Sequence, residues 1–347
     1  MNLLTHIPAL VVVIPLLAAF ATPIIGKINK KYLGLFVTAI LGITLVMTLI
    51  LASNVLTKGP AIYVFGGGDI SITHPSGFFA PIRIIFQIDA MSIFMGLIAS
   101  LVFFLAAVYS LSFMIKHTGL EKYYTLLLLL SVGMSGMVYT GDAFNFFVFL
   151  EIASISSVAL VAFKSTDLGE AAEAGIKYLV VSAIAGSMVL FSVAIFYGQY
   201  NVLNIATIAD VMRFTQLDKI ALIILVTVLA MKAGSVPMHM WTPDSYSEAP
   251  AAITMTLVAV SQASLYALFR FSFTLYNIKM DTVTVGWIII ILGVLSMFIG
   301  VTMAIIQKDI KRLMAYHAVS QTGYMLLGVG VGLAVLANPI ALESFGI

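Results

Sequence analysis

The chain has 347 residues, of which 61% are hydrophobic and only 9% are charged, and its formal net charge is +2. Soluble proteins average roughly 45–50% apolar and about 25% charged residues, so this composition excludes a soluble globular protein and indicates an integral membrane protein. The chain contains no cysteine, which excludes disulfides, cysteine-ligated iron–sulfur clusters and thiol catalysis within it.

Long apolar runs predict an all-α polytopic membrane protein. A spanning helix needs roughly 18 or more apolar residues, and the uncharged run "TVTVGWIIIILGVLSMFIGVTMAII" is one clear case. The first apolar run lacks the basic region and cleavage site of a signal peptide, so we expect a retained first helix. In chain order we expect about ten transmembrane helices, at 8–26, 33–54, 89–114, 122–140, 142–163, 174–198, 219–238, 250–274, 282–306 and 312–336.

The longest predicted connection runs from about 55 to 88. It contains strand-like pieces broken by glycine and proline, which predicts an extramembrane hairpin. The motif "FGGGD" within it suggests a phosphate-binding loop, but no helix and no Lys-Ser/Thr pair follow it. A plain turn is the better interpretation.

The loop lysines and arginines predict the orientation of the chain. With the N-terminus outside, the larger share of these residues falls on the cytoplasmic side. The positive-inside rule favours that arrangement.

Two ionisable residues in apolar surroundings dominate the functional argument. Glu151 lies in "AFNFFVFLEIASISSVALVAF", and Lys232 lies in "LVTVLAMKAGSVPMHMWTPD". Charged side chains are expensive at membrane depth, face the bundle interior and find partners there. Burial favours the neutral form of a lysine, while a nearby carboxylate favours the charged form. A Glu151–Lys232 pair could therefore act as a proton switch, or it could be a static ion pair that fixes packing.

Gly234 and Pro237 follow Lys232 directly and should interrupt its helix. A broken helix at membrane depth is tolerated only where it is buried in protein or lines a watery cavity. Such helices mark ion or substrate sites in transporters, which favours the switch.

Lys177, near the start of the sixth predicted helix, has two interpretations. It could extend to the membrane interface, or it could be a second basic group close to Glu151. The histidines are scattered without metal-ligand spacing, so neither a metal nor a haem site is expected.

Four segments of the chain form a recognisable pattern. In order they are "FFVFLEIASISSVALVAF", "EAGIKYLVVSAIAGS", "MKAGSVPMHMWTPDSYSEAPAAITMTLVAV" and "KDIKRLMAYHAVSQTGYMLLG". Together they resemble the antiporter-like subunits of respiratory complex I, Mrp-type Na⁺/H⁺ antiporters and related membrane-bound hydrogenases. The resemblance covers roughly residues 85–335 and is most specific at 237–250 and 308–324.

The resemblance implies two inverted five-helix repeats, each with a broken central helix. It implies that Glu151, Lys177 and Lys232 match the ionisable residues of one half-channel. We therefore expect three parts: helices 1–3 with the hairpin (1–121), a complete first repeat of helices 4–8 with its broken seventh helix (122–275), and a truncated second repeat (276–347).

The chain departs from the family pattern in two places. The eighth predicted helix has no lysine or histidine in its central stretch and offers only hydroxyls and an amide to a polar path, including Thr256, Ser261 and Gln262. The chain also ends at Ile347, so we expect no second broken helix within it. His317 is the remaining titratable group of the second repeat's helices, and it is either a proton relay or a packing histidine.

These features predict an ion-translocating membrane subunit of a redox-driven or Mrp-type complex, carrying H⁺, Na⁺ or both. The alternatives are a structural subunit of a membrane arm and, less compatible with the family, an independent transporter of organic solutes. The expected partners are other membrane subunits, antiporter-like neighbours among them, within the lipid bilayer of an energy-converting membrane. We expect no catalytic chemistry, cofactor, metal or nucleic acid on this chain.

Overall fold

The computed structural model describes residues 3–65, 84–114, 117–164, 169–275 and 282–336. Twelve α-helices and two short strands occur in this part of the chain. The chain divides into two compact units, each considered by itself below. The first is Met1–Leu179 with Ala249–Ala263, and the second is Val180–Glu248 with Ser264–Ile347.

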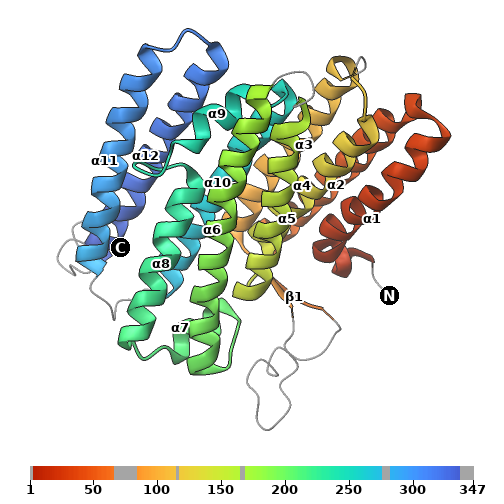
Figure 1. Cartoon of the computed structure of the whole chain (residues 1–347). Coiled ribbons are helices and arrows are strands. Elements are labelled where there is room, and N and C mark those ends of the chain that lie inside the picture. Colours follow the sequence, from red (N-terminus) through yellow and green to blue (C-terminus); the bar gives the residue numbers. More distant parts are fainter. Residues whose placement is uncertain (1–2, 66–83, 115–116, 165–168, 276–281, 337–347) are drawn as a thin grey trace. The chain divides into compact units, whose positions relative to one another are not determined.

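The first unit is built mainly from five long helices, α1 to α5 (Figure 1). Within it α1 packs against α2 and α4, α2 packs against α3, and α4 packs against α5. The unit also includes the first part of α6 (Gly169–Tyr200) and the first part of α10 (Ala251–Leu275). The five helices are α1 (Ile7–Ile28), α2 (Lys30–Lys58), α3 (Ala90–Phe113), α4 (Leu120–Tyr139) and α5 (Ala143–Val161).

Aspartates fix the starts of two of these helices. Asp89 accepts a hydrogen bond from the Ser92 backbone N–H while the Ser92 hydroxyl accepts one from the Asp89 N–H, which is a capping box at the start of α3. Asp142 accepts from the Asn145 N–H at 2.7 Å and caps α5. Both aspartates thereby satisfy backbone donors that have no partner inside the helix.

A two-stranded antiparallel hairpin, β1 (Ala61–Val64) and β2 (Ile85–Ile88), follows α2. Each strand contacts a residue at the end of a helix. The Gly141 N–H, between α4 and α5, donates to the Ile85 carbonyl at 2.9 Å, and the Tyr63 hydroxyl lies 2.9 Å from Nδ1 of His6, which precedes α1. The predicted hairpin therefore has paired strands, but α2 continues to Lys58, past the predicted boundary at 55. The turn predicted at "FGGGD" extends beyond Phe65 and lies outside the described residues.

The second unit contains the rest of α6 and α10 with α7 (Ile205–Val211), α8 (Gln216–Ala233), α9 (Trp241–Glu248), α11 (Thr282–Ile305) and α12 (Ile310–Leu336). The two C-terminal helices, α11 and α12, lie side by side (blue in Figure 1). Their backbones touch along a glycine seam, which we define as Gly286, Gly293 and Gly300 of α11 with Gly323 and Gly330 of α12. A Cβ atom added at Gly293 would lie 2.8 Å from the Gly323 carbonyl oxygen, so no larger residue fits without separating the helices.

The structure confirms an all-α polytopic membrane protein. Ten of the described helices have 18 or more residues, in keeping with the ten predicted helices. Eight of these ten are apolar enough to cross a membrane. Charged residues in α4 and α8, including Lys232, lower the apolar character of the other two. The short helices α7 and α9 were not predicted as separate elements.

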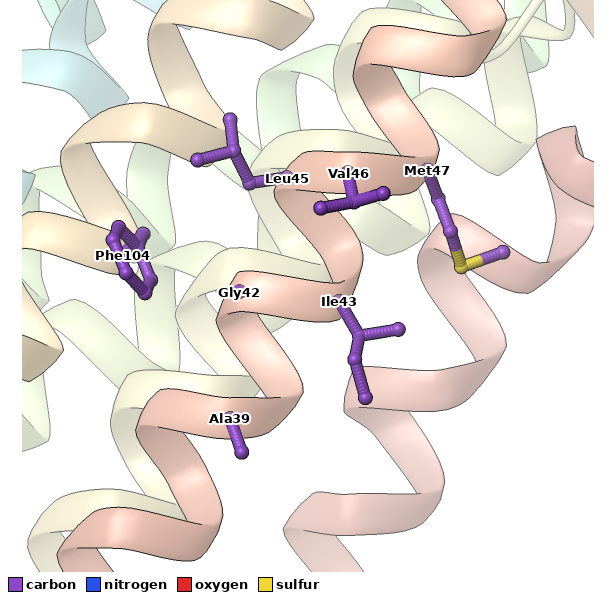
Figure 2. Close-up of a pocket in the computed structure, with 7 residues that line it drawn as sticks. All are labelled: Ala39, Gly42, Ile43, Leu45, Val46, Met47 and Phe104. Carbon is purple, nitrogen blue, oxygen red and sulfur yellow. The ribbon is translucent and has the colours of Figure 1, made fainter.

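An open hollow of about 490 Å³ lies on α2 and is closed on one side by Phe104 of α3 (Figure 2). Its lining is entirely apolar, so it offers no group that could bind an ion. It is lined by Ala39, Gly42, Ile43, Leu45, Val46, Met47 and Phe104.

Candidate functional site

The predicted interruption after Lys232 is present in the structure. α8 ends at Ala233, and α9 begins at Trp241. The connecting residues 234–240, which we call the break, start with Gly234 in the left-handed conformation at φ +83° and contain a cis Val236–Pro237 peptide bond. Gly234 N–H donates to the Met231 carbonyl at 3.1 Å and Ser235 N–H donates to the Ala230 carbonyl at 3.0 Å. This is the hydrogen-bond pattern of a Schellman motif, in which glycine supplies the positive φ.

Lys232 lies in the last turn of α8, directly before the break. Its side chain is buried, with 5% exposure, and Nζ donates to the Ser182 hydroxyl of α6 at 3.3 Å. The carbonyl end of a helix carries a partial negative charge that favours a nearby cation. The fold thus gives this buried lysine a polar neighbour and a favourable helix end.

The far side of the break is tied to α12. Arg312 forms an ion pair with Asp244 of α9 at 3.0 Å, and the Lys311 ammonium donates to the Ser247 carbonyl. One turn further along α12, Tyr316 meets the ring of the buried His239 edge-on. α9 is therefore anchored at the start of α12.

Two hydroxyls at the break are buried and have no hydrogen-bond partner within the described part of the chain. They belong to Ser235, with 0% exposure, and Thr242, with 2% exposure. The Thr242 hydroxyl lies 2.8 Å from where a Cβ of Gly234 would be, so the two ends of the break approach closely. Buried polar atoms of this kind are typical binding positions for ordered water.

The other predicted ionisable residues lie elsewhere in the fold. Glu151 is partly buried on α5 in the first unit, while Lys232 belongs to the second unit, and their pairing stays a prediction. Lys177, at the start of α6, forms an ion pair with Glu173 one turn earlier at 2.7 Å, and both side chains are largely exposed. That pair fits an interfacial position, while a role for Lys177 beside Glu151 also stays a prediction.

The residues of the predicted polar path lie on α10, and the predicted ion-translocation residue His317 lies on α12. Thr256 and Ser261 are buried, and their hydroxyls bond back to carbonyls of α10, at Ile253 and Val258 respectively. The Gln262 side-chain oxygen is buried without a hydrogen-bond partner in the described residues. His317 is exposed on α12, where its Nε2 lies 3.4 Å from the Gln321 amide.

Three hydroxyl residues at the site were missed by the sequence analysis: Ser182, Ser296 and Thr322. Ser182 bonds Lys232, while Ser296 and Thr322 bond backbone groups of the break. A serine in the apolar run "WIIIILGVLSMFIG" was a usable signal for Ser296. The described residues contain no group of three His, Asp or Glu side chains arranged to hold a metal ion.

Comparison with known proteins identifies the family. Residues 140–342, which include Glu151, Lys232 and the whole break, match the family model described as NADH:quinone oxidoreductase/Mrp antiporter, transmembrane. The chain belongs to this family. The matched region covers every helix that contributes a side chain to the break.

Several members of the antiporter family resemble the chain over most of its length. In an alignment of 340 residues that covers 94% of the chain, it is 32% identical to the protein called NADH-quinone oxidoreductase subunit N of Desulforudis audaxviator. It is 32% identical over 78% of its length to a Na⁺/H⁺ antiporter subunit of Alkalihalophilus pseudofirmus. The chain spans 64% and 55% of these curated relatives.

A solved structure of the family shows the same fold. A chain of the membrane-bound sulfane sulfur reductase, an archaeal respiratory membrane complex, superimposes with a TM-score of 0.86 at 30% identity. The match covers 97% of this chain and 69% of the other.

Proposed function

We propose that the chain is an ion-translocating, antiporter-like membrane subunit of a multisubunit complex, either redox-driven or of the Mrp type. The observation that carries this proposal is the buried Lys232, placed in the last turn of α8 directly before the break. A lysine in that position can gain or lose its proton when its surroundings change. The names of the relatives, which include an NADH-quinone oxidoreductase subunit and a Na⁺/H⁺ antiporter subunit, support the same class of function.

In this proposal Glu151 and Lys232 form the switch. When the carboxylate is close, it favours the charged ammonium, and when it moves away, burial favours release of the proton. The buried hydroxyls of Ser235 and Thr242 supply hydrogen-bonding positions for water beside the break, through which a proton could pass. Movement of H⁺ alone and exchange against Na⁺ are both compatible with these groups.

The proposal also covers the setting of the chain. Other membrane subunits, antiporter-like neighbours among them, complete the ion path, and the N-terminus faces the outside of an energy-converting membrane. The three-part organisation with boundaries near 122 and 276 belongs to the same proposal.

The decisive experiment replaces Lys232 by alanine in the assembled complex. We expect H⁺ or Na⁺ flux into membrane vesicles to fall at least tenfold, because alanine cannot hold a proton. Glu151→Gln should lower the flux in the same direction. Lys219→Ala, in the first turn of the same helix, is the matched control and should keep the wild-type flux.

The amount of assembled complex decides between the two candidate functions. Wild-type flux with full assembly of the Lys232→Ala variant would contradict the transport function. Loss of assembly, with normal flux from whatever complex remains, would instead support a structural subunit.

A further inference from the structure

Two backbone groups at the break, the Ala233 carbonyl and the Val236 N–H, do not make the hydrogen bonds that a continuous helix would give them. In a helix each carbonyl accepts from the N–H four residues later. The Ala233 carbonyl would need the N–H of Pro237, which a proline does not have. The Val236 N–H would donate to the Lys232 carbonyl, but the left-handed turn at Gly234 carries it away. Both groups belong to buried residues, Ala233 with 3% exposure and Val236 with 4%.

Side chains from α11 and α12 replace both missing partners. The Thr322 hydroxyl of α12 lies 3.2 Å from the Ala233 carbonyl oxygen and donates to it. The Val236 N–H donates to the Ser296 hydroxyl of α11 at 2.9 Å. A buried backbone group without a partner is destabilising, so these two hydroxyls stabilise the conformation of the break.

The donor and acceptor roles of the Ser296 hydroxyl are defined by its two hydrogen bonds. It donates its own proton to the Leu292 carbonyl at 2.7 Å, which leaves a lone pair for the Val236 N–H. The Thr322 hydroxyl also lies 3.1 Å from the Ala318 carbonyl of its own helix, so its single proton serves two carbonyls. Ser296 is therefore an acceptor at the break, and Thr322 is a donor.

The glycine seam holds both hydroxyls in place. Ser296 lies between Gly293 and Gly300 on α11, and Thr322 directly precedes Gly323 on α12. Backbone contact along the seam leaves little room for either helix to shift. The two hydroxyls are thus presented by a rigid pair of helices to the residues that follow Lys232.

We propose that Ser296 and Thr322 are positioning residues for Lys232. They bind the backbone of Ala233 and Val236, which lie one and four residues after Lys232. By holding this backbone they fix the position of the Lys232 ammonium relative to Ser182 and the break. This inference rests on the function proposed above, because it assigns these residues to the ion-transport role of Lys232.

The test compares Ser296→Ala and Thr322→Val with two controls in the assembled complex. Thr322→Ser keeps the hydroxyl and should restore wild-type behaviour. Thr302→Val removes a hydroxyl that bonds only to its own helix, at the Phe298 carbonyl of α11, and is exposed. We expect Ser296→Ala and Thr322→Val to lower ion flux about three- to tenfold and to shift the pH at which flux is half-maximal, because a displaced lysine titrates differently.

Hydrogen–deuterium exchange of peptides covering 231–240 gives a readout that does not depend on transport. Ser296→Ala should speed exchange there, since the Val236 N–H loses its acceptor, while Thr302→Val should not. Unchanged exchange would overturn the inference. Faster exchange with wild-type flux and pH profile would also overturn it, provided that Lys232→Ala abolishes flux. Wild-type flux in Lys232→Ala would instead contradict the proposed function itself.

Discussion

Three nearby features determine the surroundings of Lys232. These are the carbonyl end of α8, the Ser182 hydroxyl and the left-handed turn at Gly234. The carbonyl end of α8 and the Ser182 hydroxyl stabilise the ammonium. The left-handed turn at Gly234 ends α8 directly after Lys232. A substitution at Gly234 should therefore change the surroundings of the Lys232 side chain even though it does not contact that side chain.

Gly234→Ala should destabilise the break. Its φ of +83° costs an alanine about 1–2 kcal/mol, and the added Cβ would meet the Thr242 hydroxyl at 2.8 Å. We expect a lower midpoint of thermal unfolding in detergent and reduced ion flux. Gly198→Ala is the control, because that glycine lies in α6 with no atom within 4 Å of an added Cβ. Equal midpoints for the two variants would contradict this account.

Asp142, just outside the α5 span, should make stability depend on pH. Burial raises the pKa of its carboxyl from 3.8 to about 6, while hydrogen bonds from the Asn145 and Phe144 backbone oppose the rise. Because the folded-state pKa is raised, folding takes up a proton between these two pH values. The contribution of Asp142 to stability is therefore greatest below pH 3.8 and falls as the pH rises through 6. The difference is about 3 kcal/mol.

Asp142→Asn keeps an oxygen that can cap α5 but has no charge to bury. Thermal unfolding measured from pH 4 to pH 7 should therefore show a weaker pH dependence in this variant than in the wild type. A pH dependence that is unchanged by the substitution would assign the effect to another group.

The sequence singled out the lysine and the helix breakers of the candidate site, but not the hydroxyl residues that contact them. Lys232, Gly234 and Pro237 stand out because a charge and two helix breakers are rare in an apolar run. Ser182, Ser296 and Thr322 do not stand out, because a lone hydroxyl in a membrane helix can bond to its own backbone. Only the packing of distant segments shows that these three reach the lysine and the break.

At the scale of elements, α11 and α12 are in backbone contact along the glycine seam. Its glycines recur every seven residues on both helices, at Gly286, Gly293 and Gly300 and at Gly323 and Gly330. Small residues at such spacing let membrane helices approach closely and pack through their backbones. The apolar runs predict both helices, but this repeat does not stand out in the sequence, because glycine is frequent throughout the chain.

Gly293→Ala should separate the two helices. The new Cβ would lie 2.8 Å from both the Gly323 carbonyl oxygen and the Leu327 nitrogen, and backbone atoms cannot rotate away as a side chain can. We expect a clear fall in the thermal unfolding midpoint and, through Ser296, faster hydrogen exchange at 231–240.

Gly328→Ala is the matched control, because an added Cβ at this α12 glycine meets nothing within 4 Å. It should leave both measurements near wild type. If the Gly293→Ala protein is as stable as this control, α11 and α12 can separate enough to accommodate the methyl group without loss of stability.

At the scale of the whole molecule, the fold class followed directly from composition and the length of the apolar runs. The ten long helices were predicted with small errors at their ends, because hydrophobicity marks the middle of a span more sharply than its caps. α7 and α9 were missed, since seven- and eight-residue helices are too short to show a periodic pattern.

The absence of cysteine makes the predicted orientation directly measurable. Single substitutions Lys27→Cys and Lys58→Cys would place one thiol near the end of α1 and one at the end of α2, both at exposed positions. With the N-terminus outside, a membrane-impermeant thiol reagent added to intact cells should label Lys58→Cys, and it should label Lys27→Cys only after permeabilisation. The reverse pattern would invert the topology.

The glycine seam limits the motions open to the second unit. Seven residues of helix correspond to about 10 Å, so sliding α11 along α12 would restore glycine-to-glycine contact only after a displacement of that size. Smaller slides would bring bulky side chains against backbone. Within the described residues, the segment between Gly234 and Met240 is a place beside Lys232 where helical hydrogen bonding is already interrupted. Under the proposed function, a rearrangement during ion transport therefore meets less resistance in this segment than in the closely packed α11–α12 pair.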